Sequence, residues 1–127
     1  MPTANVQLPR PGFLSCLTER DEETNVYISY CLDLDLMECG RSANEAWDNL
    51  KLAVKHYMEH CYARYPEGLS KSASPEEWKH FAEVLRSCGT VSRVEEVEIN
   101  RPAVAQREYP VWMQGVDTDG TDCSNLQ

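Results

Sequence analysis

The segment from Ser42 to Cys61 constrains the fold more than any other part of the chain, because it carries the complete pattern of an amphipathic helix. Ser42 is a favourable N-cap residue, and Glu45, three positions later, completes a capping box. The apolar residues of this segment share one stripe, roughly 140° wide on a helical wheel. They are Ala43, Ala46, Trp47, Leu50, Ala53, Val54, Tyr57, Met58 and Cys61. A helix of this kind packs its stripe against the face of a β-sheet.

Three segments ahead of this helix are predicted to be β-strands, namely Phe13–Glu19, Asn25–Cys31 and Leu34–Cys39. In the second segment the side chains alternate between two faces with a period of two, which is typical of a half-buried strand. The charged run Arg20–Thr24 separates the first two segments as a turn, and Gly40 ends the third. We therefore expect two consecutive hairpins before the helix.

A second helix and one further strand are expected after the first helix. Ser74 is placed as an N-cap, Pro75 takes the first helical position, and Gly89 ends the helix. Val94–Ile99 follows with the pattern of an edge strand. The element order is thus β-β-β-α-(α)-β. It predicts an α+β domain in which an antiparallel-type sheet is packed by helices on one face.

The domain boundaries follow from changes in composition along the chain. Residues 1–12 contain three prolines and are predicted to form an N-terminal arm, whereas residues 13–100 hold all the expected helices and strands. From residue 101 the chain is polar and acidic, so residues 101–127 are expected to form a mobile acidic tail. Within that tail, Tyr109–Met113 is apolar enough to dock on the body of the protein or on a neighbouring subunit.

The charge balance restricts the class of partner. The formal net charge is −9, which disfavours direct binding of nucleic acids and favours a basic partner. No apolar run has the length of a signal peptide or a membrane span, so we expect a cytoplasmic protein. The six cysteines show no C-x-x-C spacing. We interpret them as thiols that are buried as small apolar residues.

The string His56-x-x-Glu59-His60, near the end of the first helix, has the form of a zinc-hydrolase signature. Its two histidines are four positions apart, so both can bind one metal ion. A catalytic zinc ion also needs a third protein ligand and an open position, and the expected elements supply neither. Histidines in the last turn of a helix interact favourably with its negative end. We interpret the string as a helix terminus and expect no metal or other cofactor. A metal-dependent hydrolase that uses His56 and His60 stays as an alternative.

The run Cys31–Cys39 concentrates three carboxylates, those of Asp33, Asp35 and Glu38. Carboxylates at this density can hold magnesium for phosphoryl chemistry. The first expected strand offers no central aspartate that would complete a nuclease-type site, so no catalytic residue is assigned. We interpret the run as a solvated turn. If it carries a partner-binding site, its three carboxylates would pair with lysine or arginine.

Between Val26 and about Glu59, a turn, a helix cap and an apolar helix stripe follow one another at fixed spacings that resemble those of a known protein family. The positions involved are Tyr30, Cys31, Asp33, Leu34, Asp35, Gly40, Ser42, Glu45, Ala46, Asn49, Leu50 and Ala53. In this combination the stretch resembles the HicB antitoxin family, in its HicB-like N-terminal domain. Two positions depart from the family pattern, namely Leu32, where a proline is frequent, and Trp47, where a leucine is usual.

The resemblance implies a partial RNase H-like fold without the nuclease carboxylates. It also implies a non-enzymatic antitoxin that binds and masks a small basic mRNA-cleaving toxin of the HicA type. Family members often add a C-terminal DNA-binding module, but residues 62–127 show no pattern of one, so no direct DNA binding is expected. We expect a homo-oligomer. A stand-alone regulatory or small-ligand-binding module with the same fold is the other alternative.

Overall fold

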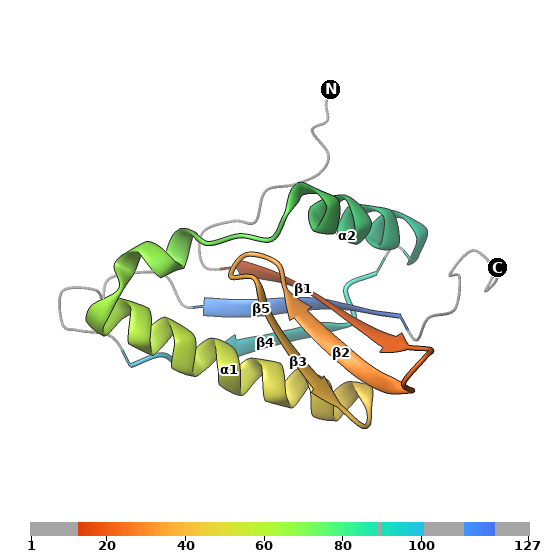
Figure 1. Ribbon diagram of the computed structural model, residues 1–127, viewed down its shortest axis with the longest axis horizontal. Helices are drawn as coiled ribbons and strands as arrows, with labels where there is room; N and C mark the ends of the chain where they lie inside the picture. The colour runs from red at the N-terminus through yellow and green to blue at the C-terminus, as the bar shows by residue number, and fades with distance from the viewer. Residues whose placement is uncertain (1–12, 89, 101–110, 119–127) are drawn as a thin grey trace.

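The computed structural model of the protein describes residues 13–88, 90–100 and 111–118, which form one mixed β-sheet with two α-helices. The elements in chain order are β1 (Phe13–Asp21), β2 (Val26–Cys31), β3 (Leu36–Gly40), α1 (Ala43–Arg64), the 3-10 helix η2 (Pro66–Ser70), α2 (Pro75–Cys88), β4 (Arg93–Val97) and β5 (Val111–Thr118). Figure 1 shows their arrangement. The expected α+β class is confirmed.

The sheet has five strands in the order β3-β2-β1-β5-β4. Strands β1, β2 and β3 form the two expected antiparallel hairpins, and β4 pairs with β5 in the antiparallel sense. However, β1 and β5 run parallel, with Leu14 opposite Met113 and Leu17 opposite Val116. The expectation of an antiparallel-type sheet is therefore wrong for the β1–β5 pair, and the sheet is mixed. A parallel neighbour needs a long crossover, and here everything from β2 to β4 lies between the two strands in sequence.

The two hairpins close through residues with a left-handed backbone. Asn25 has φ 62° at the end of the β1–β2 loop, and Asp35 has φ 56° at the end of the β2–β3 turn. Asparagine and aspartate tolerate this conformation better than other residues with a side chain. The side chain of Asp21 secures the first loop by accepting hydrogen bonds from the Glu23 amide and the Thr24 hydroxyl, at 3.2 and 2.8 Å.

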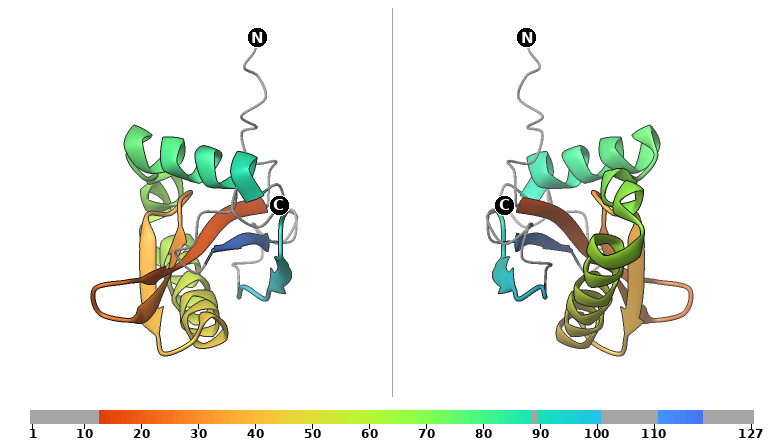
Figure 2. Two further views of the ribbon diagram at one scale, coloured as in Figure 1. Left: turned by 90° about the vertical axis from the view of Figure 1, so that its right-hand side faces the viewer. Right: turned by 90° about the vertical axis from the view of Figure 1, so that its left-hand side faces the viewer.

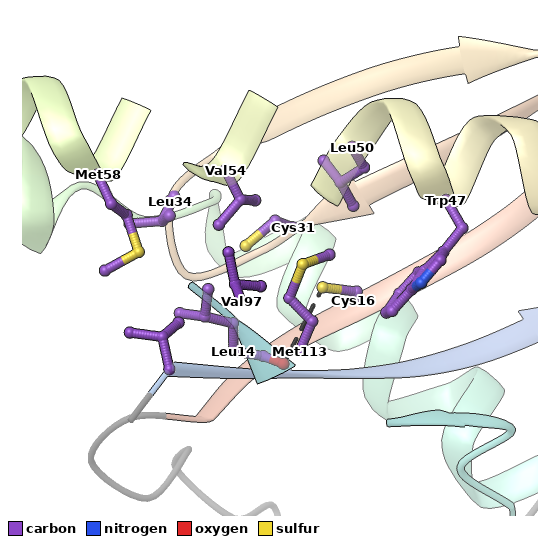
Figure 3. Close-up of a cluster of buried hydrophobic side chains, with 11 residues drawn as sticks. Leu14, Cys16, Cys31, Leu34, Trp47, Leu50, Val54, Met58, Val97 and Met113 are labelled. Atoms are coloured by element: carbon purple, nitrogen blue, oxygen red, sulfur yellow. Dashed lines mark hydrogen bonds between the residues drawn. The ribbon is translucent and has the colours of Figure 1, made fainter. Parts of the chain in front are cut away.

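Helix α1 begins as its sequence predicts and covers one face of the sheet. The Glu45 amide donates to the Ser42 hydroxyl at 3.0 Å, and the Glu45 carboxylate accepts from the Arg41 amide at 2.6 Å. Six stripe residues are buried, which confirms the predicted stripe; they are Ala46, Trp47, Leu50, Val54, Met58 and Cys61. Four of these, Trp47, Leu50, Val54 and Met58, pack with side chains of β1, β2, β4 and β5 and with Leu34 of the β2–β3 turn to form the main core cluster (Figure 3).

Two cysteines form the centre of that cluster. Cys16 of β1 lies directly opposite Cys31 of β2, and both side chains are fully buried free thiols. Cys61 is buried as well, whereas Cys39 is exposed. The interpretation of cysteines as small buried apolar residues is thus confirmed for three positions and wrong for Cys39, because β3 is an edge strand.

Helix α2 packs against the opposite face of the sheet, so the expectation that both helices share one face is wrong (Figures 1 and 2). The reason lies in β1, where the consecutive residues Cys16 and Leu17 are both buried. Side chains of consecutive strand residues point to opposite faces, so β1 needs cover on both sides. Leu17 and Val116 form a second core cluster with partly buried side chains of α2.

Strand β5 corrects the expectation of an acidic tail beginning at residue 101. Residues 111–118 form an inner strand between β1 and β4, with Val111, Met113, Gly115 and Val116 buried. Gly115 permits this packing, because a Cβ atom there would lie 2.7 Å from the ring of Trp47. The expected docking of Tyr109–Met113 is correct for residues 111–113, as a strand. The arm at residues 1–12 and the tail segments 101–110 and 119–127 lie outside the described residues.

Candidate functional site

The three carboxylates predicted as a partner-binding site have different surroundings. Asp33 turns inward and accepts a hydrogen bond from the backbone amide of Ser15 at 2.5 Å. Burial raises the pKa of its carboxyl group to about 6, because desolvation penalises the charged form more than the amide hydrogen bonds favour it. Asp33 therefore fixes the β2–β3 turn to β1.

The β2–β3 turn is not the solvated loop that its sequence suggests. Leu32 and Leu34 are each only 1% exposed, and Leu34 belongs to the α1-side cluster whereas Leu32 belongs to the α2-side cluster. The Leu32 amide donates to the Ser15 carbonyl at 2.9 Å, and the Leu32 carbonyl accepts from the Ala73 amide at 2.8 Å. The turn thus joins the strands to the segment that precedes α2.

Asp35 and Glu38 are exposed, but they lie on different sides of the sheet. Asp35 accepts a hydrogen bond from the Tyr30 hydroxyl at 2.5 Å. Burial, followed by that bond and the charge of Asp35, raises the pKa of Tyr30, so the hydroxyl stays a donor. Glu38 is opposite Ser29 in the β2–β3 ladder, and Ser29 is buried on the α1 side. The structure does not bring the three predicted residues together.

One of them, Asp35, lines a hollow of about 640 Å³ on the α2 side of the sheet. We call this the acidic hollow. Its walls come from β1, the β1–β2 loop, β2, the β2–β3 turn, β3 and the first turns of α2. Five carboxylates line it, those of Glu19, Asp21, Glu22, Asp35 and Glu77, against one guanidinium, that of Arg20, and one histidine, His80.

Most of these charged groups already have partners. Glu19 contacts His80 at 3.0 Å, and Asp21 and Asp35 are engaged by the hydrogen bonds described above. Among the described residues, no hydrogen bond or ion pair engages the carboxylates of Glu22 and Glu77. Glu22 belongs to the β1–β2 loop and Glu77 to α2, so two separate elements present unpaired negative charge to the same hollow.

The floor of the acidic hollow is apolar. Leu17 and Leu32 are buried beneath it, Ile28 is partly buried, and Met37 is 59% exposed at its edge. Methionine side chains are over-represented on adaptable binding surfaces. The hollow therefore combines an acidic rim with an apolar base, and it has the size of a small-ligand pocket.

The residues that carry the family resemblance mainly determine the fold. Cys31, Leu34, Ala46 and Leu50 are buried in the core, and Ala53 is partly buried. A Cβ atom on Gly40 would overlap the backbone of Glu45 and Ala46, so glycine allows the chain to pass close to the start of α1. The Asn49 side chain donates to the Cys39 carbonyl at 2.8 Å and binds α1 to the edge of β3.

The string His56-x-x-Glu59-His60 has no third ligand within the part of the chain that the structure describes. Both histidines are exposed on α1. Glu59 binds Lys55 at 2.6 Å and the Asn100 amide at 3.0 Å, and these contacts, Lys55 first, hold the pKa of its carboxyl group below the usual value. Over residues 13–88, 90–100 and 111–118, no group of three or more histidine, cysteine or acidic residues is placed to hold a metal ion.

Comparison with models of protein families found no match to this chain, and comparisons with curated proteins and with solved structures also found none. Within the described residues, no helix is both long enough and apolar enough to span a membrane.

Sequence reasoning missed most of the acidic hollow. Glu19 ends an expected strand and Glu22 belongs to the expected turn, whereas Glu77 lies three residues after the N-cap Ser74. Their convergence depends on α2 lying over the far face of the sheet, which the pattern did not predict. The one available signal was Met37, an apolar residue that alternation places on the opposite face of the strand from Leu36.

Proposed function

We propose that this chain is a non-enzymatic HicB-like binding protein that binds and masks a small basic partner, as an antitoxin masks a HicA-type mRNA-cleaving toxin. The observation that carries the proposal is the acidic hollow, where five carboxylates face one guanidinium over an apolar floor. A surface of this kind attracts basic proteins over long distances and orients them on contact.

The topology supports the proposal as well. Three antiparallel strands are followed by α1 and later by β5, which lies beside β1 and runs parallel to it. This arrangement is compatible with the partial RNase H-like fold that the resemblance implies. The acidic residues of the β2–β3 turn do not converge, and their neighbours Leu32 and Leu34 are buried. Recognition is therefore assigned to the hollow, with Asp35 as its contribution from the predicted set.

Co-expression with the product of the adjacent reading frame tests the proposal. We expect a short basic protein that arrests growth when it is expressed alone, and we expect this chain to restore growth and to purify with it. The test variant is Glu22→Lys/Glu77→Lys, which reverses the charge at the two unpaired carboxylates, both at exposed positions. Growth restored equally by the variant and the unaltered chain would contradict masking through the hollow.

A second function is favoured by the same hollow. A pocket with convergent polar groups is also the expected feature of a stand-alone regulatory or small-ligand-binding module. This alternative differs in one observable, because a small cationic ligand would raise the thermal midpoint of the purified chain without any protein partner. A complex that forms only with a basic protein would exclude it.

A further inference from the structure

We infer that the acidic hollow docks an extended segment of a partner protein that alternates lysine or arginine with aliphatic side chains. The inference rests on the proposed function and specifies the chemistry of the partner. It is carried by the unpaired carboxylates of Glu22 and Glu77 above an apolar floor that includes the exposed Met37.

The acidic rim favours the basic side chains of such a segment, and the apolar floor favours its aliphatic side chains. Lysine or arginine heads along the segment can pair with the free carboxylates, one on the β1–β2 loop and one on α2. The aliphatic side chains that alternate with these cations can cover Ile28 and Met37. In an extended chain, successive side chains alternate between two directions, so an alternating sequence presents all cations to one side.

The energetics favour a protein segment over a small cation. Each exposed ion pair typically changes affinity only a few-fold, so two carboxylates cannot hold a lone ammonium group tightly. A segment adds apolar burial over Leu17, Ile28 and Met37 to the two ion pairs. Apolar burial supplies most of the affinity, and the carboxylates supply the selection for basic partners.

The side chains already paired in the hollow also limit what can enter. His80 neutralises Glu19 when it is protonated, and Tyr30 donates to Asp35. An anionic segment would be repelled by the carboxylates of Glu22 and Glu77, and a purely apolar segment would remove water from them without supplying a partner. Selection against such partners is therefore built into the rim.

Titration calorimetry with the full chain tests this inference. The probe is a blocked synthetic peptide of alternating lysine and valine, and the comparison peptide replaces each lysine with glutamate. We expect the lysine peptide to bind and the glutamate peptide not to bind. Glu77→Gln should weaken binding about threefold, and the Glu22→Gln/Glu77→Gln variant about tenfold, as expected for one and two exposed ion pairs. Only the Glu77 backbone amide binds the Ser74 hydroxyl, so replacing the Glu77 side chain leaves the cap of α2 in place.

The matched control is Glu83→Gln, which removes the same charge from an exposed position of α2 that does not line the hollow. It should bind the lysine peptide as the unaltered chain does. Met37→Ser should weaken binding without changing the charge. An equal loss in the Glu83→Gln control would indicate a general charge effect and overturn the inference, as would binding that the double variant leaves unchanged.

Spermidine forms the last arm of the experiment. Binding of spermidine as tight as that of the peptide would assign the hollow to free polyamines and overturn docking of a protein segment. Failure of the inference is distinguishable from failure of the proposed function. If a basic toxin still co-purifies with the Glu22 and Glu77 variants, the proposed masking holds, but the toxin binds a surface other than the acidic hollow.

Discussion

The two faces of the sheet are covered by helices of different character. Helix α1 places six buried residues on its face, whereas none of the described side chains of α2 is buried. Trp78 and Phe81 of α2 contact each other edge to face at 6.1 Å and cover only part of the second face. The remainder of that face is the acidic hollow. The comparison indicates that the α1 face contributes most of the stability, and we propose that the α2 face serves recognition.

The largest difference between the faces should appear on truncation of core residues. Leu50→Ala removes a fully buried side chain from the α1 face and should lower the free energy of unfolding by about 3 kcal/mol. Phe81→Ala, on the partly covered α2 face, should cost about half as much, because its side chain is already partly in water. Urea unfolding of both variants measures the difference. Equal losses of unfolding free energy in the two variants would contradict the proposed difference between the two faces.

A smaller loss is expected from overpacking between α1 and β5. Gly115→Val places a side chain against the ring of Trp47 and should cost about 2 kcal/mol, because neither the strand nor the helix can move freely. Ser87→Val, at an exposed position of α2, serves as the control for the change in propensity. Thermal unfolding followed by tryptophan fluorescence reports both. A Gly115→Val midpoint equal to that of the control would exclude tight packing at this contact.

Asp33 lies in the β2–β3 turn, which contributes one residue to each core cluster. Its partly buried carboxyl group predicts that the free energy of unfolding depends on pH. Its folded pKa of about 6 lies above the ordinary value of 3.8 for an aspartate, so its protonation favours the folded state. This contribution is complete below the unfolded pKa and is lost as the pH rises through about 6. After allowance for partial exposure of the carboxyl group, it amounts to about 1–2 kcal/mol.

The Asp33→Asn variant isolates that contribution, since asparagine cannot ionise and can still accept from the Ser15 amide. Urea unfolding at several pH values between about 4 and 7 should show the unaltered chain losing stability relative to the variant as the pH rises. Other carboxylates contribute equally to both proteins and cancel in the difference. Parallel curves would show that Asp33 is not desolvated.

The smallest effect is expected at Glu59, the acidic residue of the histidine string. Glu59→Gln weakens its contacts with Lys55 and the Asn100 amide and should cost less than about 1 kcal/mol. Its folded pKa is lowered, so its contribution is present above the unfolded pKa and is lost as the pH falls through the folded one. Urea unfolding at neutral and acid pH measures this. A loss larger than that of Leu50→Ala would mean that Glu59 has another role.

The α1 face could be predicted from sequence because its signals are local. The cap at Ser42 and the stripe through Leu50 and Val54 depend only on helical periodicity. The α2 face could not, because it depends on long-range pairing. Strand β5 is recognisable only through its neighbours β1 and β4, since its residues alternate poorly and end in an acidic segment. Missing β5 concealed the need for cover on both faces, and with it the hollow.

The same reasoning explains the outcome for the two sequence motifs. The aspartates at positions 33 and 35 are separated by one residue in sequence, but one turns inward to Ser15 and the other outward to Tyr30. Spacing alone cannot distinguish these directions in a turn that contains a left-handed residue. His56 and His60 share the exposed surface of α1 as helical periodicity predicts, and their role as ligands would depend on elements that the periodicity does not place.

The division of roles between the two faces is tested most directly by a nuclear magnetic resonance titration of the labelled chain with the lysine–valine peptide. The account predicts that backbone amide shifts change for residues 17–22, 28–37 and 77–80, which border the acidic hollow. It predicts no change along the buried stripe of α1 from Trp47 to Met58. Shift changes concentrated on α1, with the hollow unaffected, would contradict it.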